Sequence, residues 1–377
     1  MARKSFSEKA IEEFYDSGEF RLHQERNDFL LPQIVDFVRK RRWINLHPEY
    51  QRRLVWDGKK KSLLIESLLM NVPIPPVFLF EYDLNLYETM DGQQRLNTIV
   101  DFYTNRFKLV GLKKWKMLNG RTYDDCPPRI QSGLDRRRLS ATILLAESRS
   151  SASTGDDVRR TVFERLNTGG QNLNTQELRN CLYSGPFNDL LIRLAGKRIF
   201  NELWDMPAYK DNIRRNHVSK ALRENRYYKR MTDCEIVLRF FAFRKRSRLR
   251  GAVKTILDNC MERYQDSPAE KLDEFHRLFM SRIKLAKDIF GDHTFRIPDE
   301  AGRERLSIPL YDATMVALDE LFAQRDALIV NRLSIYRGLC DLFAVEENYE
   351  IIVGRPNTAP AIKIRQQLIR DLFRANI

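Results

Sequence analysis

The strongest indication of the fold comes from the stretch Leu86-Tyr87-Glu88-Thr89-Met90-Asp91-Gly92-Gln93-Gln94-Arg95-Leu96. Its first five residues mix apolar, aromatic and β-branched side chains, which favours a β-strand. From Leu96 to Tyr103, apolar residues recur at the spacing i, i+3, i+4 and i+7, which is typical of one face of a helix. A glycine between the two patterns predicts a tight strand-to-helix turn at Gly92.

The residues around this turn carry both strand and helix signals. Upstream, a helical face ends at Asn71-Val72-Pro73, and aromatic or branched residues then flank a short polar turn at 83–85. These patterns predict a helix over residues 58–70 and strands over 77–82, 86–90 and 139–146. We therefore expect an α+β domain over residues 1–185.

The C-terminal part of the chain is different, because nearly every segment after residue 156 predicts a helix. Apolar residues at helical spacing define the main candidates, over residues 234–243, 275–290, 309–322 and 362–373. We expect a mainly α-helical domain over residues 186–377.

Composition narrows the class of protein. The 377 residues carry 65 Lys+Arg against 51 Asp+Glu, a formal net charge of +14. This surplus makes a polyanion such as DNA the first partner to test, because Lys and Arg neutralise phosphates. The five cysteines are widely separated and fit buried thiols in a cytoplasmic protein. Apolar runs are far shorter than the roughly 20 residues of a membrane span, so no membrane partner is expected.

The turn at Asp91-Gly92-Gln93-Gln94-Arg95 has the features of a phosphate site. Glycine lets the backbone approach a ligand closely, and a helix N-terminus presents free N–H groups with partial positive charge. Arg95 adds a cation with fixed geometry, and Asp91 could hold Mg²⁺ through water. The ordinary alternative is that Asp91 is an N-cap and Gly92 a turn residue.

Two further segments combine polar residues in ways that fit ligand binding. Gln51 and Arg52 lie in an extended stretch beside Tyr50, which suits phosphate contact and base stacking, although a solvated sheet edge has the same pattern. Gly169 and Gly170 end one helix, just before the Asn174-x-x-Glu177 capping box. Their loop could line a pocket with backbone amides, or it could be a tight helix–helix connection.

Runs of basic residues recur along the chain, and the run from 244 to 250 is the densest. Any single run is usually a solvated surface, whereas several runs that converge would form a track for nucleic acid. The candidate DNA contacts are Arg41, Arg42, Arg137, Arg138, Arg244, Lys245, Arg246 and Arg248.

Three segments, taken in order, resemble one family closely: Tyr50-Gln51-Arg52, Met90-Asp91-Gly92-Gln93-Gln94-Arg95-Leu96, and Phe163-Glu164-Arg165-Leu166-Asn167-Thr168-Gly169-Gly170. The family is the N-terminal domain of GmrSD-type restriction endonucleases. It is similar in turn to the ParB/sulfiredoxin-like superfamily. The resemblance implies a ParB-like α+β domain with a small mixed sheet.

The resemblance also implies site residues. The nucleotide site would comprise Gly92, Gln93 and Gln94 with Gln51, Arg52, Arg165, Asn167 and Gly170. Asp91, Arg95 and Glu164 would be catalytic, and Asp91 would be the metal ligand. The expected cofactors are a nucleoside triphosphate and Mg²⁺, and an NTPase is the expected enzyme.

Family members are commonly part of prokaryotic defence against phage or modified DNA, often with an HNH-type nuclease. The histidine-rich signature of that nuclease is missing from the C-terminal half, so a partner subunit could supply cleavage. The leading hypothesis is a nucleotide-binding and NTP-hydrolysing, DNA-acting defence protein. Two alternatives stay open: a metal-dependent DNA nuclease that uses the same pocket, and a non-catalytic module that binds modified DNA or regulates a partner.

Overall fold

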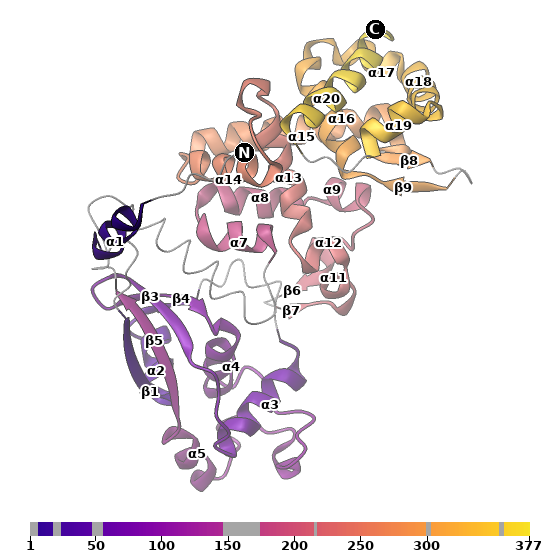
Figure 1. Cartoon of the computed structure of the whole chain (residues 1–377). Helices are drawn as coiled ribbons and strands as arrows, with labels where there is room; N and C mark the ends of the chain where they lie inside the picture. Colours follow the sequence, from indigo (N-terminus) through magenta and orange to yellow (C-terminus); the bar gives the residue numbers. More distant parts are fainter. Residues whose placement is uncertain are drawn as a thin grey trace. The chain divides into compact units, whose positions relative to one another are not determined.

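A computed structural model describes residues 7–17, 24–46, 56–145, 174–214, 217–298, 303–353 and 358–377. The chain forms two compact units, residues 1–172 and 173–377 (Figure 1). The division falls before helix α7 (Thr175–Leu182), and this helix contacts α13 (Thr232–Phe243) and α14 (Val253–Tyr264) of the second unit. From the sequence, we expected the first domain to end at residue 185 and therefore to include this helix.

The first unit contains a five-stranded mixed sheet, in the order β1-β5-β3-β4-β2. The strand β5 is antiparallel to β1 but parallel to β3, and β4 is antiparallel to β3 but parallel to β2. This arrangement confirms the predicted α+β class with a small mixed sheet. The strands are β1 (Gln24–Leu30), β2 (Ile44–Asn45), β3 (Val77–Asp83), β4 (Leu86–Asp91) and β5 (Arg138–Leu145).

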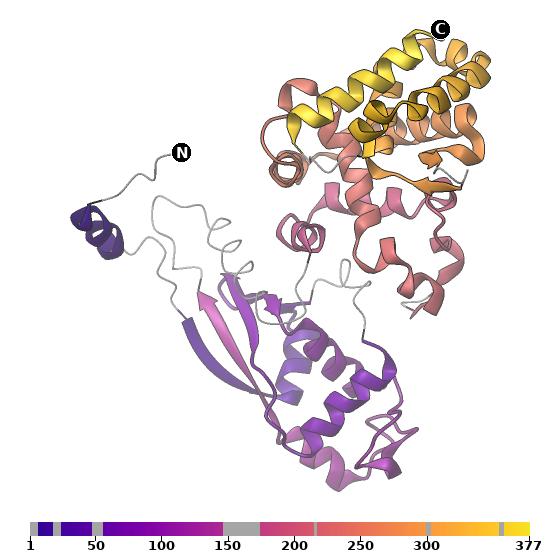
Figure 2. The same ribbon diagram turned by 45° about the vertical axis from the view of Figure 1, so that its right-hand side comes forward.

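Helices gather on one face of this sheet, as Figure 2 shows. The core beneath them includes alternate strand residues such as Leu79, Ala141 and Ile143, because successive side chains of a strand point to opposite faces. Leu96 and Ile99 supply the facing side of the helix that follows the Gly92 turn. The helices of this face are α2 (Leu31–Arg39), α3 (Gly58–Leu69), α4 (Gln93–Tyr103) and α5 (Pro128–Asp135).

Two shorter elements complete the described part of the first unit. Helix α1 (Glu8–Ser17) lies near the N-terminus, and one turn of 3₁₀-helix, η2, spans Lys116–Leu118. Helix α3 begins at an Asp57 cap whose side chain accepts a hydrogen bond from the Lys60 amide at 2.8 Å.

The second unit is mainly helical, as predicted, with two small hairpins. Helix α13 lies at its centre, with most of its side chains buried against α8, α14 and α16. The other helices are α8 (Pro186–Ala195), α9 (Arg198–Leu203), α10 (Tyr209–Asn212), α11 (Lys220–Glu224), α12 (Arg226–Lys229), η5 (Arg246–Arg248), α15 (Ala269–Phe290), η6 (Gly291–His293), α16 (Ile308–Glu320), η7 (Phe322–Gln324), α17 (Arg325–Val330), α18 (Arg332–Ala344), α19 (Glu346–Val353) and α20 (Ala359–Arg374). The hairpins are β6 (Ile213–Arg214) with β7 (His217–Val218), and β8 (Arg296–Pro298) with β9 (Glu304–Leu306).

A buried ionic network ties α13 to its neighbours. Arg239 makes a two-pronged contact with Asp312 of α16, at 2.6 and 3.0 Å, and its Nη1 lies 3.3 Å from Glu235. Glu235 also lies 3.4 Å from Arg179 of α7, which binds Asp258 of α14 at 2.7 Å. Burial raises the pKa of the Asp312 carboxyl, and the Arg239 cation opposes that rise.

Three of the four cysteines whose side chains the structure describes are buried, as predicted. Cys126, Cys234 and Cys260 are buried and Cys340 is half-buried, and none of these four forms a disulfide. Among the described helices, none combines the length and the apolar character needed to cross a membrane.

Candidate functional site

Gly92 forms the strand-to-helix turn and is required there for two separate reasons. Its φ of 90° lies in the left-handed region, which strains any side-chain-bearing residue. A Cβ at this position would also lie 2.3 Å from Val77 Cγ1 and 2.8 Å from Arg95 Nη2. The backbone at Gly92 therefore fits against β3 only because no side chain intervenes.

The two glutamines after Gly92 hold the chain on either side of residues 47–55. The Gln93 side chain donates a hydrogen bond to the Leu46 carbonyl, and the Gln94 Oε1 accepts one from the Trp56 amide at 3.1 Å. These contacts place both flanks of the Gln51–Arg52 segment at the start of α4. Gln51 and Arg52 themselves lie outside the described residues.

Arg95 turns back toward the end of β4. Its Nη2 donates to Asp91 Oδ2 at 2.8 Å and to the Pro76 carbonyl at 3.2 Å. The Arg95 side chain is 16% exposed and that of Asp91 is 49% exposed. The Arg95 Nε is buried, with no hydrogen-bond partner among the described residues. The site thus presents a half-exposed carboxylate with a largely buried guanidinium behind it.

The first turn of α4 adds backbone donors to this arrangement. Helix α4 begins at Gln93, so its first amides lack partners within the helix, and the helix dipole favours an anion near them. The Leu96 amide already donates to the Gly92 carbonyl at 3.0 Å. Over the described ranges, no group of three or more His, Cys, Asp or Glu side chains is arranged to hold a metal ion.

The helical side of the predicted pocket lies outside the described part of the chain. Glu164, Arg165, Asn167 and Gly170 fall within residues 146–173, which the structure leaves undescribed. The predicted capping box that follows them is present: the Asn174 side chain accepts from the Glu177 amide at 2.8 Å, and Glu177 accepts from the Asn174 amide at 2.6 Å. The ligand-binding roles of all these residues stay predictions.

The predicted DNA contacts of the first unit have different environments. Arg41 binds Asp36 at 2.9 Å and lies over the Trp43 ring, and its hydrogen bond holds the Asp36 pKa below the usual range. Arg137 donates to the Leu69 carbonyl at 3.0 Å, at the end of α3, which is a structural contact. Arg42 and Arg138 are exposed and have no charged partner within the described ranges.

The cations of the basic run at 244–250, in the second unit, also differ in their interaction partners. Arg244 is half-buried and binds Asp319 at 2.7 Å, and this carboxylate also binds Arg282 at 2.9 Å. Arg246 donates to Gln367 Oε1 at 3.0 Å, and Arg248 donates to the Tyr264 hydroxyl at 3.0 Å. Lys245 is exposed, without a partner among the described side chains. The other four cations of the run, Lys245, Arg246, Arg248 and Arg250, are exposed and have no carboxylate partner among the described residues.

One residue near this run, Arg263, was not predicted from the sequence. Arg263 lies on α14 beside a small pocket that Arg248 also lines. A signal was available, because Ile256, Asn259, Cys260 and Arg263 follow the i, i+3, i+4, i+7 spacing of one helical face. The spacing does not show that Arg248 lies at the same pocket, because that contact joins separate elements of the fold.

A comparison with protein families identifies the first unit. Residues 32–184 match the family described as GmrSD restriction endonuclease, N-terminal domain. This match confirms the resemblance to the GmrSD-type restriction endonuclease N-terminal domain that the sequence motifs carry over this part of the chain. Searches among curated proteins and among solved structures gave no significant match. The likeness to the ParB/sulfiredoxin-like superfamily stays a prediction.

Proposed function

We propose that this is a restriction-type, DNA-acting protein whose first unit binds and hydrolyses a nucleoside triphosphate at Asp91–Arg95. The observation that carries the proposal is the fit at Gly92, where the backbone reaches the start of α4 with no room for a side chain. A turn of this kind brings backbone amides and a helix dipole close to a phosphate group. The family match supplies the restriction-type context and makes DNA the expected partner.

Arg95 and Asp91 would have complementary roles in this site. The Arg95 guanidinium, paired with Asp91 at 2.8 Å, would hold a phosphate by charge-assisted hydrogen bonds. The half-exposed Asp91 carboxylate would then orient water or hold Mg²⁺, which is commonly bound by one or two carboxylates together with substrate phosphates. When bound, Mg²⁺ would neutralise charge on the phosphate oxygens. Glu164 would complete the site from outside the described residues.

The proposal is tested with the full chain, each nucleoside triphosphate and Mg²⁺, with and without DNA. Nucleotide hydrolysis and plasmid nicking are followed in the same reaction. Arg95→Ala should weaken nucleotide binding by about tenfold to hundredfold, since hydrogen bonds to a charged group contribute about 1.5–3 kcal/mol. Arg106→Ala is the matched control, because Arg106 also pairs with an aspartate, Asp101, at 3.5 Å.

The same reaction separates the alternatives. Unchanged nucleotide binding and turnover in Arg95→Ala would show that the phosphate site is assigned wrongly. DNA nicking with Mg²⁺ or Mn²⁺ that is lost in Asp91→Ala would select the nuclease that uses this pocket. Salt-dependent DNA binding without nucleotide turnover would select the non-catalytic module.

A further inference from the structure

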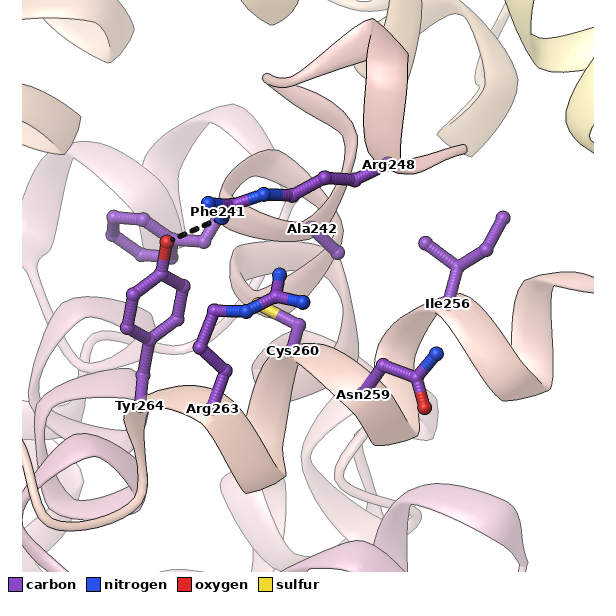
Figure 3. A pocket seen from close by; sticks show the side chains of 8 residues that line it. All are labelled: Phe241, Ala242, Arg248, Ile256, Asn259, Cys260, Arg263 and Tyr264. Carbon is purple, nitrogen blue, oxygen red and sulfur yellow. Dashed lines mark hydrogen bonds between the residues drawn. The ribbon is translucent and has the colours of Figure 1, made fainter. Parts of the chain in front are cut away.

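A small pocket opens on the second unit, far along the chain from the Gly92 turn. Its cavity volume is about 30 Å³, and Figure 3 shows the side chains around it. The buried residues of its wall are apolar or neutral, whereas its exposed residues are polar or charged. The lining residues are Phe241, Ala242, Arg248, Ile256, Asn259, Cys260, Arg263 and Tyr264.

Two arginines from different elements meet at this pocket. Arg248 ends the 3₁₀-turn η5, and its Nη1 donates to the Tyr264 hydroxyl at 3.0 Å, which fixes the direction of the side chain. Arg263 comes from the last turn of α14. In Figure 3 the Arg263 guanidinium lies in the pocket beside Cys260, while the Arg248 side chain passes over it toward Tyr264.

Neither arginine has a carboxylate partner among the described residues. Arg244, only four residues before Arg248, differs in this respect because it binds the Asp319 carboxylate at 2.7 Å, a partner that it shares with Arg282. Burial raises the pKa of the Cys260 thiol to about 12, although the nearby Arg263 and Arg248 cations oppose the rise. The thiol is therefore neutral at physiological pH, and the pocket keeps the charge of both guanidinium groups.

The size of the pocket matches the oxygens of one phosphate. A single water needs about 10–15 Å³ of such volume, so 30 Å³ accepts roughly two water-sized groups. A phosphodiester exposes two non-bridging oxygens, and guanidinium groups bind such oxygens in a bidentate manner. The Asn259 side-chain amide at the pocket provides a further donor.

We propose that Arg248 and Arg263 bind a backbone phosphate of DNA at this pocket. The inference rests on the DNA-acting part of the proposed function and assigns it a contact in the helical unit. Lys245 and Arg250 favour a polymer over a free anion, because both are exposed cations in the same short run as Arg248. Phosphate contacts of this kind fix position on the duplex and do not read its sequence.

The test compares Arg263→Gln, Arg248→Gln and the double variant with the unmodified full chain. Binding of a fluorescent DNA duplex is measured by anisotropy over a range of salt concentrations. Each single change should weaken binding by about tenfold or more and lower the slope of log affinity against log salt by about one. Arg332→Gln is the matched control, since Arg332 is an exposed arginine of the same unit without a partner among the described residues, and its slope should stay unchanged.

A conservative variant and a competition experiment identify the bound group and separate a loss of binding from misfolding. Arg263→Lys keeps the charge without the planar fork, so it should retain the salt slope but bind more weakly than the native chain. Inorganic phosphate, added at constant ionic strength, should compete with DNA for the native chain and not for the double variant. If phosphate binds at the pocket while DNA affinity stays native in all variants, the site takes a free anion and the inference is overturned.

The outcomes also distinguish this inference from the proposed function. If the native chain binds DNA and hydrolyses nucleotide, yet the pocket variants match Arg332→Gln, only the pocket assignment fails. If the native chain binds no DNA duplex, the DNA part of the proposed function fails and the pocket assignment fails with it. Tighter binding of single-stranded RNA than of DNA by the native chain, lost in the double variant, would replace the DNA assignment.

Discussion

Two arginines in this chain have the same sequence relationship to a carboxylate but very different surroundings. Arg95 pairs with Asp91 in the first unit, and Arg239 contacts Glu235 in the second; both pairs have the spacing i,i+4. Asp91 is 49% exposed at the end of a strand. Arg239 and its second partner Asp312 are only 7% and 5% exposed, inside a helical core.

This difference in exposure means that the Asp91–Arg95 pair can exchange partners, whereas the Arg239–Asp312 pair cannot. Water can reach Asp91, so the pair contributes little to stability. Under the proposed function, a phosphate would replace Asp91 as the partner of Arg95. The Arg239–Asp312 pair has lost its hydration, so removing one partner leaves an uncompensated charge in the core. Burial, and not spacing, therefore distinguishes the candidate ligand site from the structural network.

The largest effect is expected for Arg239→Met. This change leaves the buried Asp312 without its main cation and should lower the free energy of unfolding by about 3–5 kcal/mol. Urea unfolding of the full chain at neutral pH, followed by circular dichroism, measures the loss. A change below about 1 kcal/mol would show that the network is not a structural one.

The pH dependence of that loss gives a second measure of the same pair. Without Arg239, the pKa of Asp312 in the folded protein should rise further above its unfolded value. The folded protein then binds more protons than the unfolded chain between the two pKa values, so stability falls as pH rises through this window. The deficit of Arg239→Met should therefore be smaller at mildly acidic pH. The double variant Arg239→Met/Asp312→Leu should recover most of the loss and should lack this pH dependence.

A smaller effect is expected for Gly92→Ala, with Gly120→Ala as its matched control. Both glycines have a positive φ, of 90° and 84°, which costs a side-chain-bearing residue about 1–2 kcal/mol. A Cβ at Gly120 would meet open space, whereas a Cβ at Gly92 would overlap Val77. Gly92→Ala should therefore lose about 1–3 kcal/mol more than the control. Equal losses in thermal unfolding would contradict the close fit of this turn against β3.

The fold was predictable from the sequence where the apolar pattern was regular. Strands β3 and β4, helices α3 and α4, and strand β5 lie close to their predicted ranges because each buries one face in the core. Strand β1 was missed because its residues Gln24–Leu30 are mostly polar and exposed, and its pairing with β5 provides the evidence for it. Pairing between distant segments leaves no periodic signal in the sequence of an edge strand.

The candidate site was only partly predictable, for a similar reason. The turn at Gly92 follows from local sequence, since a strand pattern meets a helical pattern at a glycine. The hydrogen bonds of Gln93 to Leu46 and of Gln94 to Trp56 join residues far apart in the chain, so local patterns could not reveal them. Arg263 was missed because it meets Arg248, which is 15 residues away in the chain, only at the folded pocket.

The smallest effect on stability is expected for Asp91→Asn, and this variant tests the comparison most directly. The asparagine keeps the shape of the side chain and an acceptor for Arg95, and an exposed ion pair contributes only about 0–1 kcal/mol. Unfolding in urea should therefore change by less than about 1 kcal/mol, whereas nucleotide turnover should fall sharply because the carboxylate charge is lost. A stability loss similar to that of Arg239→Met, with turnover unchanged, would mean that Asp91–Arg95 is a second structural pair. A stable variant without turnover would instead show that Asp91–Arg95 differs from Arg239–Asp312. The Asp91 charge would then be required for the chemistry and not for folding.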